Sequence, residues 1–128
     1  MKTLLLNVYK NQVEEIEIED DLDAFYQALG CDMIEIPTRY IAGKPYSIMC
    51  DEEGLMREDV RISAISDFGE IRLVGNLMFF NDDGEGHLLG LSDADIKHIR
   101  QYIQTMYTNL HPEGYLMLTQ CEYSPQRR

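Results

Sequence analysis

Basic residues are scarce in this sequence. It has 11 Lys and Arg residues against 23 Asp and Glu residues, which gives a formal net charge of −12 over 128 residues. The electric field of such a protein repels phosphate backbones and favours encounters with basic partners. The charge therefore argues against direct nucleic-acid binding, and its simplest role is to keep the protein soluble.

Long apolar runs are also missing. The run from Leu4 to Leu6 ends at Asn7, well short of the roughly 7 to 15 apolar residues in a signal peptide. No later segment approaches the about 20 apolar residues that a membrane-spanning helix needs. We therefore expect no secretion signal, no membrane span and a cytoplasmic location.

Cysteine is rare and its spacing does not suit a disulfide framework. Cys31, Cys50 and Cys121 are odd in number and far apart, as is typical of reduced thiols. A cysteine nucleophile needs an electropositive setting, whereas Asp32 and Asp51 follow two of these cysteines directly. The pattern predicts inert thiols.

Recognisable metal-binding patterns are absent as well. His87, His98 and His111 form no His-x-x-x-His pair, and the cysteines form no Cys-x-x-Cys pair. The acidic segment 81–87 shares only its composition with a calcium loop, since the EF-hand pattern fails at its first and last ligand positions. We expect a solvated turn there rather than a weak cation site. We also expect the protein to bind no metal and no cofactor.

The sequence contains no catalytic signature. A non-enzymatic function is therefore favoured over an enzyme.

The first third of the chain predicts a hairpin followed by a helix. Alternating apolar residues over 4–18 form the hairpin, with its turn at 10–12. Residues 22–29 have apolar residues at helical spacing after an acidic start, and Gly30 supplies the stop. The residues expected to pack this helix on the sheet are Leu22, Phe25 and Leu29.

The middle of the chain predicts further strands. They are expected over 33–36, 46–50, 61–65 and 71–80. The segment 39–45 contains Gly43 and Pro45 and is interpreted as a loop, and Gly75 is expected to mark a bulge or a close backbone approach. The Asp-Gly step in 81–84 predicts a hairpin turn.

The last third predicts one long helix. Ser92 is a suitable N-cap, and a stripe of apolar residues at helical spacing extends to Leu110 before the stop at 111–114. Exposed Tyr and Met residues on this helix would favour a homodimer. A final strand is expected within 115–123, and residues 124–128 are expected to be a flexible tail.

Together these elements predict an α+β fold. We expect a mostly antiparallel curved sheet, with a short helix from the N-terminal half and a longer C-terminal helix packed on it. A length of 128 residues suits a single domain, here over 1–123, closed around one shared interior.

The order of motifs between Leu22 and Ser92 resembles the domain-of-unknown-function family numbered 3846. The features that carry the resemblance are the 22–29 helix, Gly30 before the Ile34-Glu35 strand, Glu53-Gly54-Leu55, Gly75 in an apolar strand, and Asp83-Gly84-Glu85-Gly86. The chain departs from the family at Cys31, where a second glycine is usual, and around 56–59, where a Pro-Asn step is missing. The resemblance implies an uncharacterised small protein of bacteria, their phages and conjugative elements, and it carries over no catalytic residue.

Two kinds of binding partner follow from the charged residues. Glu15, Glu17 and Glu19 are expected on the outward face of the hairpin, within 14–23, where seven of ten residues are acidic. This cluster predicts a basic protein partner, in one version through mimicry of a phosphate backbone. The alternative is a small anionic ligand or nucleotide, because guanidinium groups suit phosphates. The residues that would bind it are Arg39, Lys44, Arg57, Arg61 and Arg72.

Overall fold

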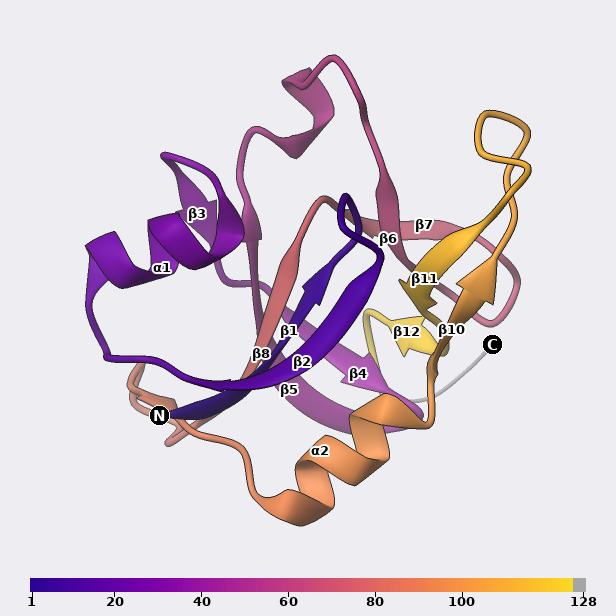
Figure 1. Cartoon of the computed structure of the whole chain (residues 1–128). Coiled ribbons are helices and arrows are strands. Elements are labelled where there is room, and N and C mark those ends of the chain that lie inside the picture. The colour runs from indigo at the N-terminus through magenta and orange to yellow at the C-terminus, as the bar shows by residue number, and fades with distance from the viewer. Residues whose placement is uncertain (126–128) are drawn as a thin grey trace.

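The computed structural model describes residues 1–125, which form two open β-sheets and two α-helices (Figure 1). The strands of the larger sheet are β1 (Lys2–Asn7), β2 (Gln12–Glu17), β3 (Ile34–Glu35), β4 (Thr38–Ile41), β5 (Lys44–Asp51), β8 (Leu77–Asp82), β9 (Leu88–Leu89) and β12 (Cys121–Glu122). They follow the order β12-β4-β5-β8-β1-β2, with β3 paired to β5 and β9 paired to β8.

The smaller sheet lies beside the larger one and has four strands. They are β10 (Ile103–Met106), β11 (Tyr115–Leu118), β6 (Ile62–Ile65) and β7 (Ile71–Val74), in that order. The helices are α1 (Leu22–Leu29) and α2 (Asp93–Arg100), with a short 3₁₀ turn η1 (Gly54–Met56). Among the strand pairs of the described chain, β11 and β6 are parallel and the others are antiparallel. The predicted α+β class with mostly antiparallel sheets is confirmed.

The larger sheet is covered on both faces. Leu4 and Leu6 of β1 join a hydrophobic cluster that includes residues of α2 and of the smaller sheet. Leu5, between them, joins a second cluster with Phe25 and Leu29 of α1. Uninterrupted apolar runs are typical of strands buried on both sides, because alternate side chains point to opposite faces. The prediction of one shared interior is therefore wrong.

The N-terminal hairpin and α1 agree with the predictions. β1 and β2 pair antiparallel, and the Asp21 side chain caps α1 by accepting a hydrogen bond from the Ala24 N–H at 3.1 Å. Gly30 ends the helix in the left-handed conformation with φ 72°, which glycine adopts at little cost. Leu22 differs from the prediction that it packs on the sheet, because it is 51% exposed and lies outside the core.

The predicted loop at 39–45 is instead the β4–β5 hairpin. The turn consists of Ala42 and Gly43, which both have positive φ, at 49° and 89°. This conformation matches the right-handed twist of paired strands, and it is usually marked by Asn-Gly or Asp-Gly. Pro45 lies opposite Tyr40 at the start of β5, where a proline is tolerated.

The predicted strand 71–80 is two strands in different sheets. β7 ends at Val74, Gly75 turns the chain with φ 78°, and β8 begins at Leu77 in the larger sheet. Asn76 holds this crossover, because its Oδ1 accepts from the Val8 N–H at 2.9 Å and its Nδ2 donates to the Leu29 carbonyl at 3.1 Å. Gly75 therefore marks a change of sheet.

The predicted long C-terminal helix is also wrong beyond Arg100. Both α1 and α2 have eight residues, and residues 103–106 form β10, which pairs with β11. The Tyr102 carbonyl accepts hydrogen bonds from the backbone N–H and the hydroxyl of Thr119 at 2.7 and 3.0 Å, which joins the chain to the sheet directly after α2. Met106 and Tyr107 therefore lie on no helix, and the helical basis for a homodimer is lost.

The strand predicted within 115–123 is present as β11 and β12. Of the tail predicted over 124–128, residues 126–128 lie outside the described part of the chain. Neither α-helix of residues 1–125 is long and apolar enough to cross a membrane.

Candidate binding sites

The acidic residues predicted as a binding face lie along one edge of the larger sheet. β2 is the last strand of that sheet, and the chain continues from it into α1 (Figure 1). All seven carboxylate side chains of 14–23 belong to exposed residues. We call this set the acidic edge: Glu14, Glu15, Glu17, Glu19, Asp20, Asp21 and Asp23.

Two cations lie beside the acidic edge. Lys2 stands opposite Glu17 across the β1–β2 pair and forms an ion pair with Asp93. The hydrogen bond that Lys2 donates to Asp93, together with the charges of Glu15 and Glu17, raises the pKa of Lys2. The N-terminal amine lies 3.7 Å from Glu17. These two cations offset part of the negative charge of the acidic edge on the side next to β1.

The basic residues predicted to bind an anion do not form one site. Lys44 pairs with Asp95 at 2.7 Å, Arg57 with Asp51 at 2.6 Å, and Arg61 with Asp59 at 2.9 Å, so each of these cations has its own carboxylate partner. Of the five predicted residues, the structure brings Arg39 and Arg72 together.

Arg39 and Arg72 line a cavity of about 270 Å³ between β7 of the smaller sheet and the β3 and β5 region of the larger one. We call it the arginine cleft. Its apolar walls include Leu55 and Ile71, and Glu35 lies on its polar side.

An aromatic ring lies against both guanidinium groups of the arginine cleft. The ring centre of Tyr123 is 4.7 Å from the Arg39 guanidinium carbon and 4.3 Å from that of Arg72. Arg72 Nη2 also lies 3.3 Å from Glu122 and 3.6 Å from Glu70, whereas Arg39 Nη1 donates to a backbone carbonyl. The Nε atoms of both arginines are buried and have no hydrogen-bond partner within residues 1–125.

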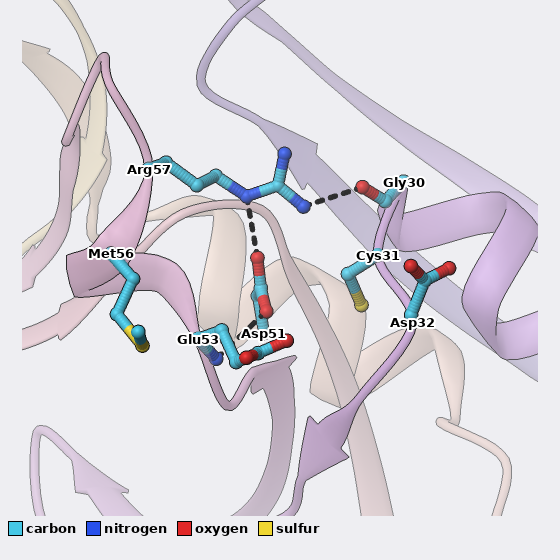
Figure 2. A pocket seen from close by; sticks show the side chains of 7 residues that line it. All are labelled: Gly30, Cys31, Asp32, Asp51, Glu53, Met56 and Arg57. Carbon is cyan, nitrogen blue, oxygen red and sulfur yellow. Dashed lines mark hydrogen bonds and ion pairs between the residues drawn. The ribbon is translucent and has the colours of Figure 1, made fainter.

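A second cavity, of about 510 Å³, contains the ion pair of Asp51 and Arg57 (Figure 2). Figure 2 shows Arg57 reaching from the segment after η1 toward Gly30, whose carbonyl accepts from Arg57 Nη2 at 2.6 Å. The Asp51 hydrogen bond raises the pKa of Arg57. This guanidinium connects the loop to the end of α1, and its charge is already paired.

The three thiols are buried and protonated at neutral pH. Burial, with a smaller contribution from Glu35, raises the pKa of Cys50 to about 12. Burial also raises the pKa of Cys121 to about 12, and that of Cys31 is raised by burial and by Asp51. These shifts agree with the prediction of inert thiols, since the thiolate is the nucleophilic form.

The acidic turn after β8 brings three potential metal ligands together. One ligand atom from each of Asp83, Glu85 and His87 lies within 4.8 Å of the others, and all three residues are exposed. The Asp83 carboxylate accepts from the backbone N–H groups of Glu85 and His87, which lowers its pKa. These hydrogen bonds hold the turn between β8 and β9, where the sequence predicted a hairpin turn.

Sequence reasoning did not connect two residues with the predicted cations that they contact. Tyr123 follows the last strand and had no signal linking it to Arg39 and Arg72, which are distant in sequence. Asp95 is buried at 4% exposure, and a Ser92-x-x-Asp95 capping pattern could have indicated it.

Two open sheets, two short helices and surface cavities define a small α+β protein. Within the chain, residues 1–106 match a family model described as "Domain of unknown function (DUF3846)", so the chain belongs to this family. The match confirms the resemblance found in the sequence. No curated protein and no solved structure matches the chain.

Proposed function

We propose that this chain is a non-enzymatic binding protein that holds a basic protein partner at its acidic edge. It would work in the cytoplasm as an accessory protein of a phage, a mobile element or their bacterial host. The observation that supports this proposal best is the exposure of all seven carboxylates of residues 14–23, along one edge strand and the segment that leads into the first turn of α1.

The charge density of the acidic edge favours a cationic partner. Carboxylates two residues apart on a strand are separated by about 6.6 Å, which is less than the Debye length of about 8 Å at physiological salt. Their mutual repulsion is therefore only partly screened. A partner with Lys or Arg side chains at matching spacing would relieve this repulsion and associate faster through electrostatic steering.

The edge position of β2 indicates how such a partner would bind. An edge strand presents unpaired backbone N–H and C=O groups, which can accept an added strand. Glu15 and Glu17 would repel a second copy of the same edge but attract an extended basic segment. We therefore propose an added basic strand, with the backbone supplying affinity and the carboxylates supplying specificity.

The test is charge reversal at three positions of the acidic edge. The triple variant Glu15→Lys, Glu17→Lys, Glu19→Lys and the wild type are each used to capture proteins from a bacterial lysate. Because an exposed ion pair contributes about 0.2 to 1 kcal/mol, the loss of three such pairs should weaken binding of the captured partner by about threefold to about 150-fold in the triple variant. Binding of wild type should also fall as salt is added.

The matched control reverses three exposed carboxylates elsewhere: Glu58→Lys, Glu85→Lys and Glu113→Lys. This variant has the same net charge as the edge variant, so it should retain binding if the position of the charges matters. An equal loss of binding in both variants would show that binding depends only on the net charge of the protein. Capture of no basic protein by wild type would contradict the proposal.

A further inference from the structure

We propose that the arginine cleft is a binding site for a small ligand with a single oxyanion, a phosphate monoester or a carboxylate, on an apolar body. This site is separate from the acidic edge. The cleft combines two guanidinium groups from different sheets with apolar walls in one cavity of about 270 Å³.

The guanidinium groups supply the anion specificity. A guanidinium binds carboxylate or phosphate oxygens through parallel N–H donors in one plane. Arg39 has no carboxylate within ion-pair distance among residues 1–125, and its Nε lacks a partner. Arg72 pairs through Nη2 with Glu70 and Glu122, but its Nε also lacks a partner. Buried donors without acceptors are unfavourable, so an oxyanion that reaches them would satisfy both.

The other residues of the cleft limit the ligand to one anionic group. Glu35 and Glu52 also line it and are exposed, so they would repel a second phosphate or carboxylate. Leu55 and Ile71 are 74% and 55% exposed, which is unfavourable for such large apolar side chains. An aromatic or branched aliphatic ligand body would cover them.

Tyr123 covers one side of both guanidinium groups. Its ring is stacked on both guanidinium groups and is 59% exposed. Because both Nε atoms are buried, a ligand oxygen reaches them only after side chains of the cleft rearrange. We expect this exposed ring to be the group that moves, so Tyr123→Ala should bind the ligand more tightly than the wild type.

The experiment observes the two Nε–H groups directly. In ¹H–¹⁵N spectra of the full chain, phenyl phosphate and benzoate are titrated separately, and inorganic phosphate and ATP serve as comparison ligands. We expect the Arg39 and Arg72 Nε–H signals to shift with phenyl phosphate or benzoate, and the stronger of these two identifies the oxyanion. Inorganic phosphate lacks the apolar body and ATP carries additional charge, so both should bind at least about tenfold more weakly.

Variants test the roles of the two arginines. Arg39→Gln and Arg72→Gln should each weaken binding about tenfold, whereas Arg100→Gln, an exposed change on α2, should have no effect. Reversal of the acidic edge at Glu15, Glu17 and Glu19 should leave binding intact, which separates this site from the proposed protein partner. The proposal is overturned if neither phenyl phosphate nor benzoate shifts the two signals at millimolar concentration, or if ATP binds more tightly than both.

Discussion

At the scale of single residues, the buried carboxylate of Asp95 is the centre of a hydrogen-bond network. Its carboxylate accepts hydrogen bonds from Lys44 Nζ at 2.7 Å, the Tyr46 hydroxyl at 3.1 Å and Asn81 Nδ2 at 2.7 Å. It also accepts from the backbone and the hydroxyl of Ser92, which completes the capping box of α2. One buried charge thus joins β5, β8 and the start of α2.

We expect Asp95→Asn to lower the free energy of unfolding by about 3 kcal/mol, because an amide NH₂ would face donors and leave Lys44 without its counter-charge. Urea unfolding at neutral pH measures this change. The control Glu113→Gln changes an exposed carboxylate and should stay within about 0.5 kcal/mol of wild type. A loss no larger than that of the control would mean that the network adds nothing to stability.

The same carboxylate makes stability depend on pH. Burial alone would raise the pKa of Asp95, but the hydrogen bonds from Lys44, Ser92 and Asn81 outweigh burial and hold it well below its ordinary value of 3.8. The unfolded state therefore binds protons at a higher pH than the folded state, and stability falls as the pH drops below about 4. Asp95→Asn lacks this contribution, so its stability should approach that of wild type as the pH falls through that range.

At the scale of elements, the crossover between the two sheets depends on Asn76. Its amide side chain connects Val8, directly after β1, to Leu29 at the end of α1. Asn76→Ala leaves a buried N–H and a buried carbonyl unpaired, so we expect a loss of about 2 to 4 kcal/mol in unfolding free energy. Asn109→Ala, in an exposed loop, is the control and should change stability by less than about 0.5 kcal/mol. Equal stability of both variants would argue against this role.

Elements with local end signals could be predicted from the sequence. Helix α1 has a capping aspartate, an apolar stripe and Gly30, and α2 begins at Ser92, so both starts were predicted correctly. The β4–β5 hairpin could not be predicted because Ala42 is a rare residue for a positive φ. The spacing of apolar residues over 103–110 suits a helix, but pairing with β11, which is distant in sequence, makes 103–106 a strand.

The candidate sites show the same limit. Composition and strand alternation were enough to place the carboxylates of the acidic edge at the surface. The sequence also identified Arg39 and Arg72 as anion-binding candidates, but together with three other cations that pair with carboxylates outside the arginine cleft. Their convergence depends on how the two sheets lie against each other, and no local pattern encodes that arrangement.

At the scale of the whole molecule, the excess of negative charge opposes folding. Compacting a chain of net charge −12 brings carboxylates together, and the acidic edge concentrates seven of them. Ion pairs such as Lys44–Asp95 act in the opposite direction, but with 23 acidic against 11 basic residues most carboxylates have no cation to pair with. Repulsion among carboxylates should therefore affect the free energy of unfolding more than attraction within ion pairs does.

This balance predicts that added NaCl stabilises the protein. Raising salt from about 0.01 M to about 1 M shortens the Debye length from about 30 Å to about 3 Å, so repulsion among exposed carboxylates is screened while buried pairs are affected less. We expect a gain of about 1 kcal/mol, or about 4 °C in the thermal midpoint, measured by circular dichroism. The variant with lysine at positions 15, 17 and 19 has less repulsion to screen, so its midpoint should rise less with salt. A thermal midpoint that falls with added salt in wild type would mean that ion pairs outweigh the repulsion among carboxylates. In that case a basic partner would have no repulsion to relieve at the acidic edge.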